Sequence, residues 1–176
     1  MKRLTLFCGH YGSGKTNIAV NYALRLHSLG YDTVIADLDI VNPYFRTKDS
    51  EEKLRRAGVS VISLPFANTN VDLPTLPSEM YSVVQNRERH AVIDVGGDDS
   101  GAYAVGRFAP AIREENNFEN LYVVNFYRPL TRSAEDALCV MREVETAGGV
   151  PVTGIVNNSN LGEETAAQHV IETFGA

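Results

Sequence analysis

A glycine-rich stretch near the start of the chain constrains the fold more than any other feature. The sequence GHYGSGKT at residues 9–16 satisfies the pattern G-x-x-x-x-G-K-[ST]. An apolar run at 4–8 precedes it, and a segment with apolar residues at helical spacing follows it. In such a loop, glycines let backbone N–H groups converge on one anion, and the helix N-terminus adds positive potential. The pattern therefore predicts a strand, a phosphate-holding loop and a helix in succession.

The rest of the chain continues this alternation of strands and helices. The strand segments are mostly continuous apolar runs, as in parallel strands that are covered on both faces. We expect strands at 4–8, 33–37, 59–64, 90–95, 121–126 and 151–156. We expect helices at 15–29, about 49–57, 75–87, 101–115, 131–147 and 163–174. Repeated units of this kind predict one α/β domain over residues 1–176, a doubly wound and mostly parallel sheet with helices on both faces.

Charge and composition exclude several classes of protein. The net charge is −6 over 176 residues, which argues against direct binding of nucleic acid or an acidic membrane surface. The apolar run at the start is too short for a signal peptide, and no stretch approaches the length of a membrane span. Cys8 and Cys139 lack C-x-x-C spacing and are expected to be buried free thiols. These features predict a cytoplasmic protein.

The carboxyl ends of parallel strands bind ligands in such sheets, so the residues that follow each strand are informative. The segment HAVIDVGG ends the expected fourth strand at Asp94 and continues into Gly96 and Gly97. A carboxylate there can hold the hydration shell of Mg²⁺, and a glycine allows close approach of backbone to a terminal phosphate. The alternative interpretation is a solvated turn at the end of a strand.

A second acidic element, VIADLDIVNPYFR, follows the expected second strand. Asp37 and Asp39 alternate around Leu38, so both side chains would face the same side of an extended segment. Beside a phosphate loop, they suit a metal ligand and a group that orients an attacking water. The alternative is that one of them only caps the strand. The segment 42–46 then forms either a contact patch or a proline-initiated turn.

These three elements, in this order, resemble the MinD/ParA-type ATPases. That family belongs to a broader P-loop group that includes nitrogenase iron protein and the dethiobiotin and cobyrinate amide-forming enzymes. The resemblance covers nearly the whole chain and implies ATP and Mg²⁺ as cofactors. It implies that Asp39 positions the attacking water and that Asp94 is the Walker B aspartate. It also implies an adenine contact from Asn157 or Asn158, for which turn formation is the alternative, and no N-K-x-D guanine pattern is present.

The expected site is therefore specific. Lys15 and Asp39 are the expected catalytic residues, and Thr16, Asp37, Asp39 and Asp94 are the expected metal ligands. The residues expected to bind the nucleotide are Gly9, Tyr11, Gly12, Ser13, Gly14, Lys15, Thr16, Asn17, Gly97, Asn157 and Asn158.

The sequence departs from the family at the second loop position. The family's loop carries a lysine there that reaches the nucleotide of a dimer partner, whereas this chain has His10 followed by Tyr11. A neutral imidazole does not replace a permanent cation, so a nucleotide-dependent homodimer lacks its signature residue. Hydrolysis is expected to be slow unless a protein partner supplies a cation. The segment 163–174 is acidic on its polar face, unlike a membrane-binding tail.

Three functions remain open from the sequence. The leading hypothesis is a Mg²⁺-dependent ATPase that acts as a nucleotide switch through the segments 37–46 and 94–107. A second is an ATP-dependent ligase or transferase acting on a small carboxylate, with Tyr44, Arg46 and Arg107 near the substrate. The third is a nucleotide-binding scaffold with little turnover.

Overall fold

The computed structural model describes residues 1–39, 47–63, 78–97 and 99–175, and only the backbone of residues 47–50, 78, 99 and 100. The expected contact patch at 42–46, including Tyr44 and Arg46, lies outside the described residues. The same holds for residues 64–77.

The described residues form one parallel sheet of six strands, in the order β3-β2-β4-β1-β5-β6. Every paired strand runs parallel to its neighbour. The strands are β1 (Leu4–Cys8), β2 (Thr33–Leu38), β3 (Ser60–Ser63), β4 (His90–Val95), β5 (Phe118–Val124) and β6 (Gly154–Asn157). The strand before the phosphate loop is therefore central, with β4 on one side and β5 on the other. This confirms the doubly wound α/β fold.

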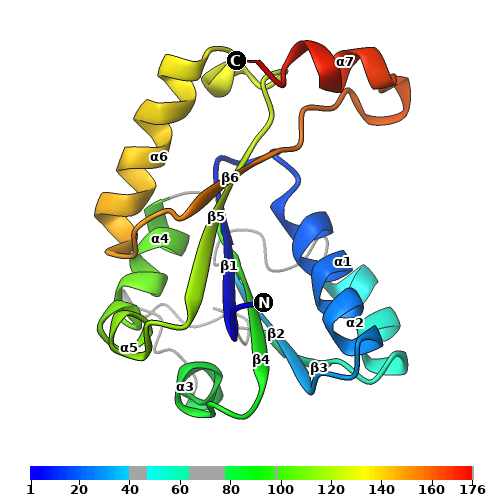
Figure 1. Cartoon of the computed structure of the whole chain (residues 1–176). Coiled ribbons are helices and arrows are strands. Elements are labelled where there is room, and N and C mark those ends of the chain that lie inside the picture. Colours follow the sequence, from blue (N-terminus) through cyan, green and yellow to red (C-terminus); the bar gives the residue numbers. More distant parts are fainter. Residues whose placement is uncertain (40–46, 64–77, 98, 176) are drawn as a thin grey trace, which may run out of the picture.

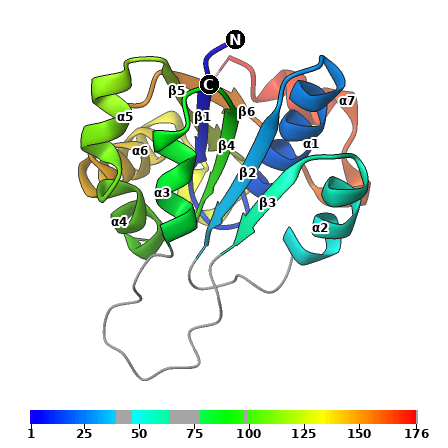
Figure 2. The same ribbon diagram turned by 90° about the horizontal axis from the view of Figure 1, so that it is seen from below.

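Helices cover both faces of the sheet. The helices are α1 (Lys15–Ser28), α2 (Thr47–Arg56), α3 (Ser78–Gln85), α4 (Asp99–Gly106), α5 (Ala109–Glu115), α6 (Ala134–Gly148) and α7 (Ala167–Glu172), with short 3₁₀ turns at Pro129–Thr131 and Gly162–Glu164. Figures 1 and 2 show α1 and α2 on one side of the sheet and α3 to α6 on the other. Each described helix is too short or too polar to traverse a bilayer.

Alternating side chains of the central strand divide the core into two layers. Leu4, Leu6 and Cys8 of β1 pack in the cluster beneath α3 to α6. Phe7 points to the opposite face and packs with Ala19 and other residues of α1. Both faces of the sheet are therefore covered by apolar side chains, as the continuous apolar runs predicted. Polar side chains are found instead at the ends of the strands.

Three sequence expectations were wrong in detail. The expected helix at 163–174 is instead a 3₁₀ turn at Gly162–Glu164 followed by the shorter α7. A single helix over 101–115 is instead two helices, α4 and α5, because Pro110 lies in the first turn of α5 and cannot continue a preceding helix. Cys139 is exposed, although Cys8 is buried as expected. Helical spacing alone could not reveal either the break or the orientation of Cys139 on α6.

A buried ion pair lies at the amino ends of the strands, opposite the phosphate loop. The Arg3 side chain pairs with Glu115 at the end of α5, and both side chains are buried. Its Nη1 donates to the carbonyl oxygens of Val83, Asn86 and Arg89 at 3.2, 3.1 and 3.0 Å. One guanidinium thus ties β1 to α3, β4 and α5, and this residue is structural.

Candidate functional site

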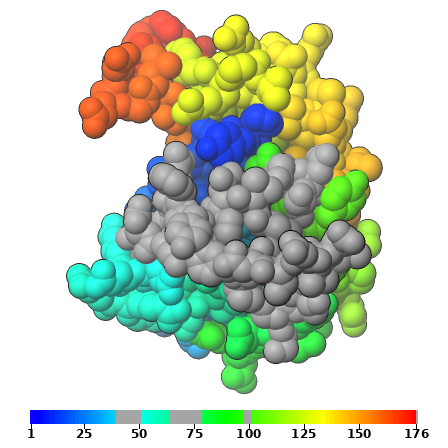
Figure 3. All heavy atoms as spheres, turned by 180° about the vertical axis from the view of Figure 1, so that it is seen from behind, coloured from blue at the N-terminus to red at the C-terminus, as the bar shows by residue number. Residues whose placement is uncertain are grey.

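The loop at residues 9–16 curls tightly between β1 and α1. Gly9, Gly12 and Gly14 have φ angles of 138°, 78° and 92°, in the region that favours glycine. Gly14 is the N-cap of α1 and has no side chain with which to cap the helix. The backbone thus has the tight curl that the motif predicted for an anion cradle. Figure 3 shows the N-terminal segment, in blue, reaching the surface beside the yellow-green segment after β5.

Lys15 lies at the mouth of this loop. Its side chain is buried, and its Nζ donates a hydrogen bond of 3.1 Å to the carbonyl of His10. A Cβ added to Gly97, after β4, would lie 3.0 Å from this Nζ and 2.7 Å from the amide nitrogen of Tyr11. Two loops far apart in the sequence therefore converge on one ammonium group, and only glycine fits at position 97.

The acidic residues meet on neighbouring strands. Asp37 of β2 is the register partner of Asp94 of β4, and they are 3% and 2% exposed. The Asp39 backbone N–H donates to Asp37 Oδ1 at 2.9 Å. The strand pairing therefore places both acidic elements at the same edge, next to the strand that carries the phosphate loop.

The charged form of the Asp94 carboxyl group is destabilised by its surroundings. Burial raises its pKa to about 7; the charges of Asp37 and Asp39 push in the same direction, while a hydrogen bond from Thr16 and the charge of Lys15 oppose them. Among the described residues, its Oδ1 has no hydrogen-bond partner. A buried carboxylate oxygen left in this state is costly unless a cation or a donor meets it.

These residues fit a magnesium–phosphate complex better than a bare metal ion. Mg²⁺ prefers six oxygen ligands and is usually held by one or two carboxylates together with phosphates and waters. In the described part of the chain, no three His, Cys, Asp or Glu side chains form a metal-binding group. Thr16 and Asp94 supply a hydroxyl and a carboxylate beside the anion cradle, and the nucleotide would complete the set.

The two asparagines after β6 occupy different surroundings. Asn158 Nδ2 donates to the carbonyl of Ser13 at 2.7 Å, directly on the phosphate loop. Asn157 Nδ2 donates instead to Thr173 Oγ1 at 3.0 Å, and its Oδ1 accepts from Ser159 N–H at 3.0 Å. Asn158 is therefore part of the site's frame, while Asn157 anchors the end of β6 to the segment after α7.

Tyr11, Asn17 and Ser13 differ in their exposure to solvent. Tyr11 is 64% exposed at the outer side of the loop. Asn17 is exposed on the first turn of α1, where its carbonyl accepts from Asn21 Nδ2 at 2.8 Å. Ser13 is buried, and its Oγ has no hydrogen-bond partner within the described residues. A phosphate oxygen would give that hydroxyl a partner.

Arg128, which sequence reasoning missed, touches the same loop from the β5 side. Its Nε donates to the carbonyl of Gly12 at 3.0 Å. The position of residues 127–131 after an expected strand places Arg128 at the ligand-binding end of the sheet, but it does not reveal a contact across 116 residues.

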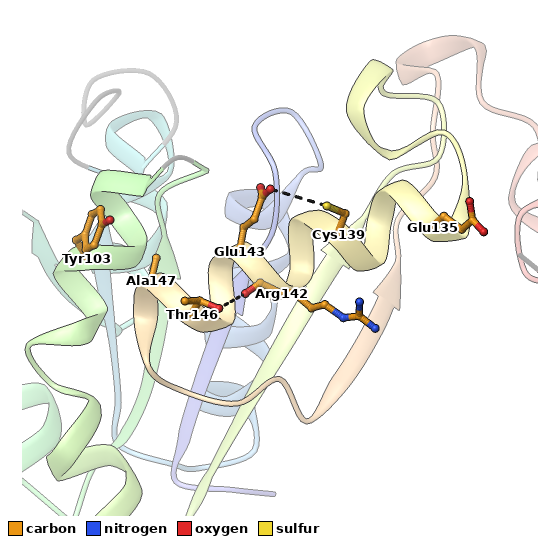
Figure 4. Close-up of a pocket in the computed structure, with 7 residues that line it drawn as sticks. All are labelled: Tyr103, Glu135, Cys139, Arg142, Glu143, Thr146 and Ala147. Carbon is orange, nitrogen blue, oxygen red and sulfur yellow. Dashed lines mark hydrogen bonds between the residues drawn. The ribbon is translucent and has the colours of Figure 1, made fainter.

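A separate hollow of about 460 Å³ lies between α4 and α6 (Figure 4). Tyr103 and Cys139 are at its border, and no residue of the phosphate loop lines it. The Cys139 Sγ lies 3.8 Å from Glu143 Oε1 on the same helix. This hollow is distinct from the site described above.

No protein-family model matches the sequence, and no curated protein is significantly similar to it. Several solved structures do match its fold. The BceF tyrosine kinase domain has a TM-score of 0.57 at 19% identity, over 88% of this chain and 68% of that one. FlhF complexed with GTP and Mg²⁺ has a TM-score of 0.60 at 14% identity, over 97% of this chain and 60% of that one.

FtsY from Mycoplasma mycoides gives a TM-score of 0.59 at 19% identity, over 89% of this chain and 51% of that one. The present chain thus spans about half the length of FtsY. At such low identities these similarities establish the architecture alone. This chain has the α/β fold of the P-loop NTPases, with its signature loop after the central strand.

Proposed function

We propose that this protein binds ATP with Mg²⁺, hydrolyses it slowly and acts as a nucleotide switch. The observation that carries the proposal is the buried Asp94 carboxylate, which accepts a hydrogen bond from Thr16 at the foot of the phosphate loop and has one oxygen without a partner. A carboxylate in that position is destabilising for the nucleotide-free protein and useful only beside a cation.

Each side chain has a role in this proposal. Lys15 neutralises the β and γ phosphates, while Thr16 and Asp94 hold the hydrated metal ion. Asp39, at the end of β2, orients the attacking water. Bound Mg²⁺ supplies charge neutralisation on the phosphates. Asp37 fixes the turn into Asp39 through the hydrogen bond to its backbone.

The choice of adenine rests on the loop after β5. Guanine carries N–H groups that donate hydrogen bonds to a carboxylate, as in the N-K-x-D pattern of GTPases. Residues 125–130 read NFYRPL and contain no carboxylate. Asn158, whose amide both donates and accepts, is the closer of the two candidate asparagines to the nucleotide loop. FlhF, solved with GTP and Mg²⁺, supports nucleotide binding at this fold but not the adenine.

The switch follows from where Asp39 and Gly97 lie. Both belong to segments that leave the sheet beside the expected γ-phosphate, and Gly97 lies against the backbone of Tyr11. Loss of that phosphate would remove an anchor from both segments.

The proposed likeness to MinD/ParA-type ATPases rests on the order of the motifs. Because His10 stands at the signature-lysine position, we expect the protein to remain monomeric with ATP, as light scattering after gel filtration would measure.

Calorimetry with Mg-ATP tests binding. Lys15→Ala should weaken the affinity by at least about tenfold, because it removes a charge-assisted hydrogen bond to phosphate. Lys53→Ala, an exposed lysine of α2, is the matched control and should leave the affinity unchanged. Equal affinities of the wild-type protein and Lys15→Ala would remove the assignment of the loop.

Phosphate release tests the ATPase. Asp39→Asn should abolish turnover while Mg-ATP still binds, because the variant keeps the shape of the side chain but not its charge. Tight ATP binding by a wild-type protein that releases no phosphate would contradict the hydrolytic part and leave the scaffold hypothesis.

A further inference from the structure

The guanidinium of Arg128 is hydrogen-bonded to the phosphate loop through Nε, and the side chain is exposed to solvent. Its Nε donates to the Gly12 carbonyl at 3.0 Å, and a Cβ added to Gly12 would lie 3.4 to 3.8 Å from Nε, Cδ and Cζ. Arginine has five N–H donors, so four remain on the terminal amino groups. Among the described residues these groups have no hydrogen-bond or ion-pair partner, and Arg128 is exposed.

The loop that carries Arg128 is built rigidly. The buried Asn125 accepts from Tyr127 N–H through Oδ1 at 3.0 Å, and its carbonyl accepts from Arg128 N–H at 3.0 Å and from Thr131 Oγ1 at 2.7 Å. Ser159 Oγ accepts from Phe126 N–H at 3.0 Å and links this loop to the one after β6. Such a frame holds the arginine stem in place before any ligand arrives.

The sheet order separates the two ends of a bound nucleotide. Thr16 hydrogen-bonds Asp94 of β4, and Gly97 after β4 lies against Tyr11 and Lys15, so the proposed function places the metal ion and the terminal phosphate on this side of the phosphate loop. Arg128 and Asn158 approach from β5 and β6 and contact the carbonyls of Gly12 and Ser13. A nucleotide whose γ-phosphate lies on the first side must place its ribose and base on the second.

We propose that Arg128 is a nucleoside-binding residue, whose guanidinium plane lies against the purine and ribose of the nucleotide. This inference rests on the proposed nucleotide binding. A guanidinium is planar, weakly hydrated and stacks well on aromatic rings. Because the hydrogen bond to Gly12 uses only Nε, the terminal donors of the exposed Arg128 are left for the ligand. Arg128 therefore contributes to nucleotide binding in cis and does not act on the γ-phosphate.

The test compares three ligands by calorimetry: Mg-ATP, Mg-ADP and Mg-tripolyphosphate. Arg128→Met keeps the length of the stem and should weaken ATP and ADP equally, by about tenfold, with tripolyphosphate unchanged. Arg132→Met removes the same charge from an exposed residue four positions later and should change none of the three affinities. Arg128→Lys should fall between the wild type and Arg128→Met, because it keeps the charge and loses the plane.

Other outcomes overturn the proposal in recognisable ways. Equal weakening of tripolyphosphate would mean that Arg128 only braces the loop, and a larger loss for ATP than for ADP would place it at the terminal phosphate. A silent Arg128→Met, in a protein whose ATP binding depends on Lys15, would reject this inference alone. Failure of the wild-type protein to bind ATP at all would reject the proposed function together with it. Thermal unfolding of each nucleotide-free variant verifies folding.

Discussion

Asp37 and Asp94 are direct cross-strand partners on β2 and β4, and both carboxylates are buried. Like charges opposite one another destabilise a sheet. The pair therefore lowers the stability of the fold, as is common at functional sites. Because Asp94 lies beside Thr16 of the phosphate loop, the two carboxylates are suited to a metal ion bound with phosphate.

Replacing Asp94 should separate stability from function. Asp94→Asn removes the buried charge, so the free energy of unfolding of the nucleotide-free protein at neutral pH should rise by about 1 kcal/mol. The same variant should lose the Mg²⁺-dependent part of ATP binding, because an amide is a poor ligand for this ion. Urea denaturation and calorimetry with and without Mg²⁺ measure the two effects.

Asp32→Asn is the control for this pair of measurements, since Asp32 is an exposed aspartate paired with Arg89 at the surface. It should alter the unfolding free energy by less than about 1 kcal/mol and leave the effect of Mg²⁺ intact. An Asp94→Asn protein with normal Mg²⁺ dependence would contradict the metal assignment.

Gly97→Ala tests the contact between the two loops. The new Cβ would lie 2.7 and 2.8 Å from the backbone N and Cα of Tyr11, so the phosphate loop has to shift. We expect Mg-ATP affinity to fall by about tenfold, since overpacking of this kind costs about 1 to 3 kcal/mol. Gly175→Ala, where the added Cβ meets nothing within 4 Å, should bind as the wild type does. Equal affinities of the two variants would argue against close contact of these loops.

Arg3 provides a test of the fold remote from the site. Arg3→Met leaves Glu115 buried without its partner and removes three hydrogen bonds to carbonyls, so the unfolding free energy should fall by about 3 to 5 kcal/mol. Arg56→Met breaks an exposed pair with Glu52 on α2 and should cost less than about 0.5 kcal/mol. Chemical denaturation of both variants gives the comparison, and similar losses would contradict the structural role of Arg3.

The two cysteines should react at very different rates. Burial raises the pKa of the Cys8 thiol to about 12, whereas Cys139 is exposed on α6. An aromatic disulfide reagent at pH 8 should therefore label one thiol quickly in the native protein and both after denaturation. Cys139→Ser should abolish the fast phase. A fast phase that persists in this variant would show that β1 opens readily.

Much of this architecture could be predicted from local pattern. The signature loop defines its own conformation, because Gly14 and Lys15 are required by backbone geometry and charge at those positions. The Asp94 element followed from a continuous apolar strand that ends in a carboxylate. These signals are local, and the parallel connection of strands brings them to one edge whatever the intervening segments contain.

Contacts that depend on strand order could not be predicted in this way. Nothing local to Arg128 shows that β5 lies next to β1, so its hydrogen bond to Gly12 emerges only once the sheet is assembled. The break between α4 and α5 was missed for a different reason. Pro110 was read as part of a helical pattern, although proline is common in the first turn of a new helix.

The hydrogen bond from Asn158 to Ser13 joins positions 145 residues apart. During synthesis the phosphate loop leaves the ribosome well before Arg128 and Asn158, whose side chains hold the carbonyls of Gly12 and Ser13. The cradle is thus completed only after β6 has been synthesised. A fragment that carries the whole glycine-rich motif but ends before β5 would lack the contacts from Arg128 and Asn158. Such a fragment would not be a small nucleotide-binding module.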